Sequence, residues 1–289
     1  MKKIKTIKYS NSALSKLVIF PNKKMNKYSR GTCNIIAGSE KYPGAAILAC
    51  KAATRSGSGY TKLFTHKANY KYIATAIPDI PTSTFNDIKL YDQSDDKPCA
   101  YLVGPGFDPD KDNASILEKV LKETSAPVVI DGGALSSISK TSIKDLLDSR
   151  NKKNYTTILT PHAGEGKKIL SYYAVEPEKK LKEQAKQIVN HTKTTVVLKD
   201  SITYICDTSK IYEMKSGTPA LAKAGSGDVL AGILAAVLCQ NKINSFDACV
   251  LSTNIHAKAA KLASKDLSTI SVTPLNLIEY LPKSIQLIA

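Results

Sequence analysis

The chain has 289 residues, of which 43% are hydrophobic and 23% are charged, so it can bury a substantial core and is not an intrinsically disordered protein. No apolar run approaches the roughly 20 residues that span a bilayer, and the apolar patch at residues 17–20 is too short for a secretory signal. The six cysteines are scattered and form no Cys-x-x-Cys pair, which predicts buried, reduced thiols in a cytoplasmic protein.

More than half of the formal net charge of +16 comes from residues 1–30, which contain nine Lys or Arg and no acidic residue. We interpret these residues as a basic N-terminal arm and residues 31–289 as one domain. A field of this sign attracts polyanions, nucleotides included. The arm lacks aromatic interleaving and recognised nucleic-acid motifs, so nucleic acid is an unlikely partner. The function of the arm stays open.

The first elements after the arm predict a βαβ unit. Residues 33–38 are typical of a short buried strand, residues 45–54 of a helix built from small side chains, and residues 60–64 of a second strand. Gly44 and the two alanines after it give a helix start that a ligand can approach closely. Tight packing of this helix on the sheet explains the same small residues equally well.

Residues 78–98 are rich in Pro, Asp, Ser and Thr, and we interpret them as a surface excursion. Continuous apolar strands, typical of a parallel sheet covered on both faces, follow along the chain. Because the carboxyl ends of parallel strands share one edge, their tips are expected to line a ligand site there. These strands and tips are residues 100–103 before Gly104-Pro105-Gly106, residues 128–131 at Asp131, residues 157–162 at His162, and residues 196–200 at Lys199.

Residues 202–206 and 211–214 indicate a short antiparallel addition to the sheet. The C-terminal third is predicted to be helical over residues 229–239, 245–263 and 275–280. We find no internal repeat and no low-complexity linker in the sequence. The predicted fold class is therefore α/β, with a mostly parallel central sheet and helices on both faces.

The segment Gly225-Ser226-Gly227-Asp228 precedes a run of small and apolar residues. It predicts a tight glycine loop that opens a buried helix, whose free N–H groups and positive dipole end can hold a phosphate. An aspartate there is repelled by a resting phosphate, but it is well placed to act as a base beside a phosphate in transfer. The alternative is an ordinary turn in which the helix dipole stabilises Asp228. The spacing fits neither a dinucleotide-binding fingerprint nor a P-loop.

Several motifs occur in a fixed order: Ala37-Gly38-Ser39, Pro43-Gly44-Ala45-Ala46, Gly104-Pro105-Gly106, Asp131-Gly132-Gly133-Ala134-Leu135, Leu159-Thr160-Pro161-His162-x-Gly164-Glu165, Val197-Leu198-Lys199, and Pro219-Ala220-Leu221-Ala222-Lys223-x-Gly225-Ser226-Gly227-Asp228. Taken together they resemble the ribokinase-like superfamily and, more narrowly, the ADP/ATP-dependent NAD(P)H-hydrate dehydratases. The resemblance covers the chain from about residue 31 to the end. The glycine loop indicates only the superfamily, whereas the Thr-Pro-His and Ala-Leu-Ala-Lys elements are more specific to the dehydratases.

The resemblance implies a ribokinase-like three-layer fold and an enzyme that repairs hydrated NADH and NADPH with ADP or ATP, together with Mg²⁺. In such enzymes the ring hydroxyl is phosphorylated and then leaves as phosphate, which implies Asp228 as the catalytic base. The resemblance also implies a homotetramer and a separate epimerase in the same pathway. It assigns no residue as a metal ligand.

The implied contacts fall into two groups. The adenine nucleotide is implied to contact Lys199, Asp200, Ser201, Ile202, Thr203, Gly225, Ser226 and Gly227. The hydrated dinucleotide is implied to contact Ala46, Gly106, His162 and Asp228.

Residues near these positions have alternative roles. His162 is either a ligand contact or a hydrogen-bonded loop residue. Asp131 is either a ligand contact or a cap of the next helix, and the structural role is favoured. Lys223 either neutralises phosphate or is merely solvated, and Glu165 is expected to cap or orient its own turn.

Three positions depart from the family pattern, because Asp200 and Ala224 replace glycines and Gly166 replaces an aromatic residue. They leave the choice of nucleotide and the substrate contacts open, but they do not touch Asp228. Two other functions are considered. A ribokinase-like kinase of vitamin precursors or sugar alcohols would use the same loop, although the two dehydratase-specific elements argue against it. A catalytically silent protein that binds nucleotide or nucleic acid would bind its partner with a steep salt dependence.

Overall fold

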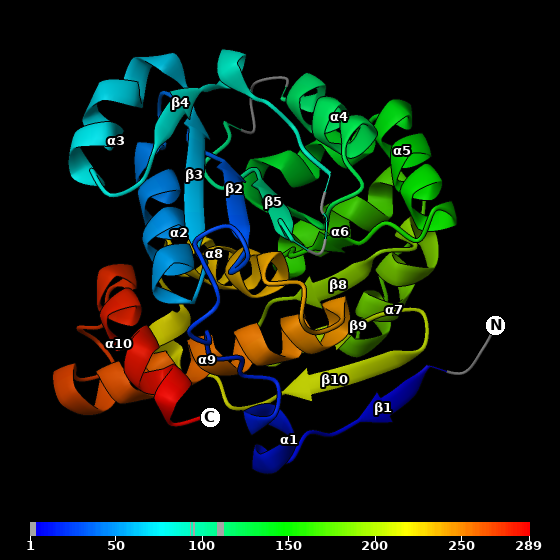
Figure 1. Ribbon diagram of the computed structural model, residues 1–289. Coiled ribbons are helices and arrows are strands. Elements are labelled where there is room, and N and C mark those ends of the chain that lie inside the picture. Colours follow the sequence, from blue (N-terminus) through cyan, green and yellow to red (C-terminus); the bar gives the residue numbers. More distant parts are fainter. Residues whose placement is uncertain (1–3, 93, 95, 109–112) are drawn as a thin grey trace.

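The computed structural model describes residues 4–92, 94, 96–108 and 113–289. Within these residues ten strands form one sheet, in the spatial order β1-β10-β9-β8-β7-β6-β5-β2-β3-β4 (Figure 1). Neighbouring strands from β8 to β4 are parallel, whereas β9 is antiparallel to both β8 and β10. The strands are β1 (Lys5–Ile7), β2 (Thr32–Ile36), β3 (Tyr60–Thr65), β4 (Thr82–Thr84), β5 (Cys99–Val103), β6 (Val128–Ile130), β7 (Thr157–Leu159), β8 (Thr195–Leu198), β9 (Thr203–Cys206) and β10 (Lys210–Met214).

Helices cover both faces of this sheet, which confirms the predicted α/β class. One face carries α2 (Pro43–Arg55), α3 (Tyr70–Ala76), α8 (Ser226–Cys239), α9 (Ser245–Leu267) and α10 (Pro274–Gln286), and the other carries α4 (Ala114–Glu123), α5 (Thr141–Lys152), α6 (Ala163–Tyr172) and α7 (Leu181–Thr192). Shorter helices are α1 (Asn11–Ser15), η1 (Lys67–Asn69), η2 (Phe85–Asp87), η3 (Gly132–Ser139) and η4 (Pro219–Leu221).

The core has two parts because successive residues of a strand point to opposite faces. In β2, Ile35 packs with the residues under α2, α8 and α9, and Ile36 packs with those under α4 to α7. Both side chains are fully buried. The central strands are therefore apolar throughout, which is the pattern that predicted them from sequence.

Two three-residue edge strands were not predicted. β4 lies within residues 78–98, interpreted as a surface excursion, and it pairs with β3. β1 lies in the basic arm and pairs with β10. Both strands are at most partly buried, so no apolar run marks them in the sequence. The excursion also buries Ile80 and Ile88, so it belongs to the folded body and its interpretation as a surface segment is corrected.

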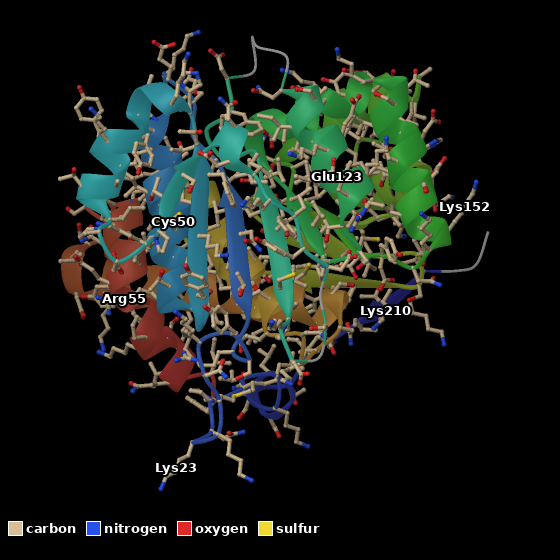
Figure 2. The ribbon with its side chains drawn as sticks, turned by 45° about the horizontal axis from the view of Figure 1, so that its top comes forward. Lys23, Cys50, Arg55, Glu123, Lys152 and Lys210 are labelled. Atoms are coloured by element: carbon tan, nitrogen blue, oxygen red, sulfur yellow. The ribbon has the colours of Figure 1, made fainter. Side chains whose placement is uncertain are left out.

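The described part of the basic arm packs against the domain, where the Tyr9 hydroxyl donates a hydrogen bond to the Asp247 carboxylate of α9. The basic side chains are not confined to the arm. Lys23, Lys152 and Lys210, which come from the arm, α5 and β10, lie at separate places on the rim of the molecule (Figure 2).

All six cysteines are free and buried, as the sequence predicts. Along the described chain, no helix is both long and apolar enough to cross a membrane.

Helix α8 has buried residues on every side because it lies between the sheet and the helices α2 and α9. Its Gly232 faces α2, where a Cβ atom would lie 2.2 Å from the Ala49 carbonyl oxygen. Only a residue without a side chain permits so close an approach of the two helices. This packing fixes the position of α8 and therefore of the glycine loop from which it starts.

We expect Gly232→Ala to lower the free energy of unfolding by about 1–3 kcal/mol, because the added methyl forces α2 and α8 apart. The higher helix propensity of alanine, about 1 kcal/mol, does not offset this clash. Gly44→Ala, in the first turn of α2, is the matched control, since a Cβ there meets no atom within 4 Å. Urea unfolding of both variants measures the difference, and wild-type stability of Gly232→Ala would contradict this account of the packing.

Candidate active site

The tips of the parallel strands meet at one edge of the sheet, as predicted. β2, β5, β6, β7 and β8 are neighbours in register, so the residues that follow them lie side by side. Beyond the last strands, His162 and Lys199 still form an isolated parallel bridge. This edge is where open α/β sheets bind ligands.

The glycine loop enters this edge from α8. Gly225 has a φ angle of +91°, which side chains disfavour, and a Cβ there would lie 2.7 Å from a methyl carbon of Leu48. Among the residues that the structure describes, no side chain caps this end of α8, so its first N–H groups face the site without a side-chain acceptor. The loop therefore has the geometry of an anion-binding helix start.

Lys199 connects the loop to the tip of β6. Its Nζ lies 2.9 Å from the Oδ1 atom of Asp131, and it would lie 3.2 Å from a Cβ placed on Gly227. The Thr160 hydroxyl donates to the same Asp131 oxygen over 2.6 Å. The favoured role of Asp131 as a helix cap is wrong, because its buried carboxylate makes no capping hydrogen bond to η3 and is held by Lys199 and Thr160 instead.

Asp228 lies in the first turn of α8, close to this ion pair. Burial and the negative charge of Asp131 raise the pKa of Asp228 to about 7, although the positive charge of Lys199 opposes the shift. Burial lowers the pKa of Lys199, but attraction to Asp131, Glu165 and Asp228 outweighs it, so the ammonium form is favoured. The site thus combines a permanent cation with a carboxylate that can exchange a proton near neutral pH.

A cavity of about 810 Å³ opens beside the loop, within the range of about 300–1,000 Å³ typical of small-molecule sites. It contains all but one of the residues implied for the nucleotide, since Ile202 does not line it. Its lining includes Lys199, Asp200, Ser201, Thr203, Gly225, Ser226 and Gly227, together with Thr218 and Leu221 before the loop.

The residues implied for the dinucleotide do not all line this cavity. His162 lines this cavity, whereas Asp228, Ala46 and Gly106 do not. Ala46 and Gly106 lie around Gly38: a Cβ on Gly38 would lie 3.1 Å from the Ala46 side chain, and one on Gly106 would lie 3.4 Å from the Gly38 Cα. Gly104 connects this group to the charged cluster, because a Cβ on it would lie 2.1 Å from the Asp131 carbonyl oxygen.

His162 begins helix α6 and has a structural role. Its Nδ1 accepts the N–H groups of Gly164 and Glu165, while the Glu165 carboxylate accepts the His162 N–H over 2.8 Å. This reciprocal pair is a capping box, so the expectation that Glu165 caps its own turn is confirmed. The His162 side chain is 61% exposed, so its ring also remains open to a ligand.

Two further positions bear on the sequence analysis. Lys223 lines the cavity, and its amino group donates to the Ile270 carbonyl oxygen over 2.6 Å. Gly166, where relatives carry an aromatic residue, has no room for one, since even a Cβ would lie 2.9 Å from a methyl carbon of Leu198.

His256 and Thr253 also line the cavity, and sequence reasoning missed both. They come from the middle of α9, in a run of small and apolar residues with no motif. The one available signal is a histidine in a stretch that is otherwise typical of a buried helix.

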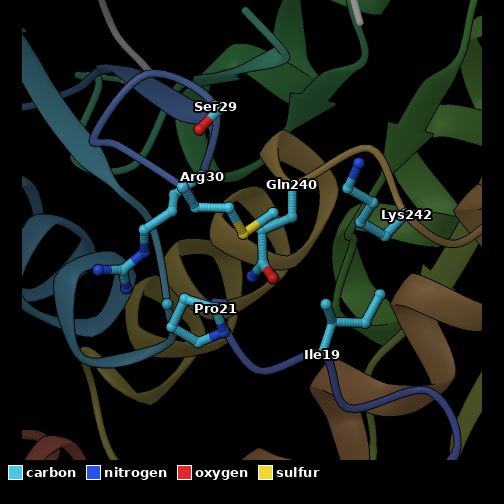
Figure 3. Close-up of a pocket in the computed structure, with 8 residues that line it drawn as sticks. Ile19, Pro21, Ser29, Arg30, Gln240 and Lys242 are labelled. Atoms are coloured by element: carbon cyan, nitrogen blue, oxygen red, sulfur yellow. The ribbon is translucent and has the colours of Figure 1, made fainter. Parts of the chain in front are cut away.

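A second cavity, shown in Figure 3, is lined by residues from the arm and from the end of α8. Its volume is about 30 Å³, which holds a water molecule but no nucleotide. None of the residues implied for nucleotide or dinucleotide lines it. The site of interest is therefore the cavity beside the glycine loop.

The chain is similar to known proteins over nearly its whole length. A sequence model described as NAD(P)H-hydrate dehydratase matches residues 33–283. The ADP-dependent (S)-NAD(P)H-hydrate dehydratase of Streptococcus pneumoniae is 26% identical over 286 residues, which cover 96% of this chain and 94% of that protein. The crystal structure of the ADP/ATP-dependent NAD(P)H-hydrate dehydratase from Bacillus subtilis, co-crystallised with ATP and Mg²⁺, superposes with a TM-score of 0.83 at 25% identity and 100% coverage of both chains.

Other relatives are longer than this chain. The bifunctional NAD(P)H-hydrate repair enzyme Nnr of Thermofilum pendens is 25% identical over 272 residues, which cover 90% of this chain but 51% of that protein. The chain thus spans about half the length of the bifunctional relatives that it matches.

Asp228→Asn is expected to stabilise the protein at about pH 8 but not at about pH 4. Folding raises the pKa of this carboxyl to about 7, so its ionisation costs free energy in the folded protein. The free energy of unfolding of the wild type therefore falls as the pH rises from 4 through 7. The gain at the higher pH should be about 1–2 kcal/mol, because partial exposure reduces the effect. Thermal unfolding at both pH values measures it.

Asp200→Asn is the control for this prediction, since Asp200 is an exposed carboxylate of the same cavity. It should change stability equally at both pH values. A pH-independent effect of Asp228→Asn would show that Asp228 ionises freely in the folded protein.

Proposed function

Because this chain belongs to the NAD(P)H-hydrate dehydratase family, we propose that it uses an adenine nucleotide to return hydrated NADH and NADPH to the reduced cofactors. One observation carries the proposal. Asp228, whose pKa is raised to about 7, stands in the first turn of an uncapped helix whose opening residues line a nucleotide-sized cavity, next to the Lys199–Asp131 ion pair. The alternative kinase function is not favoured, because the matched family is that of the dehydratases.

The nucleotide occupies the cavity beside the loop in this proposal. Its terminal phosphate rests on the N–H groups at the start of α8, where the helix dipole favours negative charge. The ammonium of Lys199 lies over Gly227 and neutralises charge on the phosphoryl group during transfer. Asp200, Ser201 and Thr203 line the same cavity and contact the rest of the nucleotide.

The hydrated nicotinamide ring approaches from the side of Ala46 and Gly106, with His162 at the cavity wall. Asp228 accepts the proton of the ring hydroxyl while the hydroxyl oxygen bonds to the terminal phosphorus atom of the nucleotide. The bond from that phosphorus atom to the oxygen of the departing nucleotide breaks in the same step. The carbon–oxygen bond then breaks and phosphate leaves, because phosphate is a far better leaving group than hydroxide. Loss of a proton from the neighbouring ring carbon restores the double bond of the reduced cofactor.

Mg²⁺ is proposed to arrive with the nucleotide phosphates. Among the described residues, no group of three or more His, Cys, Asp or Glu side chains could hold a metal ion. Asp131 is engaged by Lys199, so Asp228 is the carboxylate at the start of α8 that would hold the ion together with the phosphates. Such a site fits Mg²⁺, which is commonly held by one or two carboxylates, substrate phosphates and water. When bound, the ion would neutralise phosphate charge.

The compartment, the oligomeric state and the partner enzyme are also proposals. The buried free cysteines support a reducing, cytoplasmic compartment. The predicted homotetramer and a separate epimerase acting on the same hydrate rest on family resemblance.

The direct test adds ADP or ATP, with Mg²⁺, to hydrated NADH or NADPH and follows the near-ultraviolet absorbance of the reduced nicotinamide. We expect recovery of absorbance that depends on the nucleotide, and a loss of about 100- to 10,000-fold in kcat for Asp228→Asn. Asp145→Asn, which changes an exposed carboxylate of α5 that does not line the cavity, should retain turnover. Well-folded protein that binds nucleotide but restores no absorbance with either donor would overturn the proposal.

The pH dependence of the rate tests the role of Asp228 separately. The carboxylate must be ionised to accept a proton, so kcat/KM for the hydrated dinucleotide should rise from about pH 6, reach half its maximum near pH 7 and level off above about pH 8. Lys199→Met removes the nearby positive charge, so it should move this rise to higher pH besides lowering the rate. A rate that does not vary over this range, or an unmoved profile in Lys199→Met, would contradict the assignment.

A further inference from the structure

The basic arm forms one wall of an apolar groove that the proposed reaction does not use. This groove lies where α2 and α8 end, and its volume is about 150 Å³. An apolar space of this size accepts a group as large as a benzene ring. Its apolar lining includes Leu17, Ile19 and Phe20 of the arm, Leu251 and Ile255 of α9, and Ile285 of α10.

Apolar side chains of the arm remain exposed beside the groove. Phe20 is 62% exposed and Ile19 is 37% exposed. The small cavity of Figure 3 adjoins the groove, because Ile19, Pro21 and Gln240 line both. A single exposed apolar residue needs no explanation, but apolar residues grouped around a groove mark an interaction surface.

Cations surround the groove, and carboxylates do not. Arg55 and Lys242 line it, and Arg30 stands opposite Lys242 across the adjoining cavity (Figure 3). None of these three forms an ion pair with a residue that the structure describes, and no acidic residue of that part of the chain lines either cavity. Lys23 projects outward from the same arm (Figure 2). The groove is therefore an apolar site in a positive field.

The shape and charge of this surface favour one class of partner. A symmetric contact between two copies of the chain would bring the same cations together, which costs free energy. A nucleic acid would neutralise the cations but leave the aliphatic groove empty, and the surface of a lipid bilayer does not enter a concave groove. A peptide can fill the groove with a side chain and meet the cations with carboxylates.

We propose that this groove docks an acidic segment of a partner protein. A large apolar side chain of the segment enters the groove, and its carboxylates lie against Arg30, Arg55 and Lys242. The docking surface is separate from the nucleotide-sized cavity, since the two share no lining residue. It gives the basic arm a function that the dehydration reaction does not require.

Selection of a random peptide display library on the immobilised full-length protein tests the chemistry of the partner. We expect the enriched peptides to carry several Asp or Glu residues around one large apolar residue. Fluorescence anisotropy then measures the affinity of these peptides. Their dissociation constants should increase with salt, because salt screens the charge contacts. Replacing the apolar residue of a peptide with Ser, or its Glu with Gln, should each weaken binding.

Variants of the protein locate the binding. Phe20→Ser and Lys242→Gln should each raise the dissociation constants about tenfold, because one removes an apolar contact and the other a charge contact. Both side chains are exposed, so thermal unfolding should remain close to that of the wild type. Lys152→Gln is the matched control, since it removes an exposed lysine of α5 that does not line the groove, and it should bind the peptides as the wild type does.

Several results would overturn the inference. One is a selection without acidic peptides, and another is wild-type affinity in both groove variants. A wild-type oligomer that Phe20→Ser dissociates in sedimentation would show that a second copy covers the groove. Tighter binding of anionic vesicles or single-stranded RNA than of the peptides, lost in the same variants, would assign the surface to those partners. Because these measurements need neither nucleotide nor dinucleotide, failure of the proposed function would leave this test intact.

Discussion

The ion pair between Lys199 and Asp131 is the interaction on which the rest of the site depends. Asp131 is buried at the tip of β6, where its negative charge needs a cation. Lys199 follows β8, two strands away in the sheet, and its ammonium group reaches across the tip of β7 to Asp131. Because the lysine is engaged there, it only partly offsets the effects of burial and Asp131 on Asp228. A lysine bonded directly to Asp228 would hold its pKa low and make it a weak base. The base strength of Asp228 is therefore set by the position of Lys199, which is bonded to Asp131 and acts on Asp228 only through its charge.

Packing remote from the chemistry holds these groups in place. Helix α8 is buried on every side, and the absence of a side chain at Gly232 lets it lie directly against α2. Gly225 then turns the chain into the site with a positive φ angle against Leu48. The start of α8 has little freedom to move, so its N–H groups are arranged before a ligand arrives. Such preorganisation is what electrostatic stabilisation of a transferring phosphate requires.

Sequence reasoning succeeded where the physical signal is local. The apolar strands, the glycine loop and the capping box of His162 and Glu165 are each encoded by a few neighbouring residues, and the structure contains all three. The strands β1 and β4 were missed because three residues at a sheet edge leave no periodic pattern. The role of Asp131 was misjudged because its partner Lys199 is 68 positions away in the chain. His256 was missed for a similar reason, since only the folded chain brings it to the cavity.

The nucleotide-sized cavity and the glycine-lined strand tips are separate parts of the candidate site. The nucleotide-sized cavity lies on the side of Lys199 and Gly227, whereas Ala46 and Gly106 lie around Gly38, beyond the tip of β6. At those tips the backbones approach so closely that a Cβ on Gly104 or Gly106 would clash, which leaves bare peptide groups along the edge. In the proposed reaction, Asp228 accepts a proton from a hydroxyl on one side while the phosphate is held on the other. The separation therefore suits transfer between two bound molecules, because each can be held by its own set of contacts in the geometry of reaction.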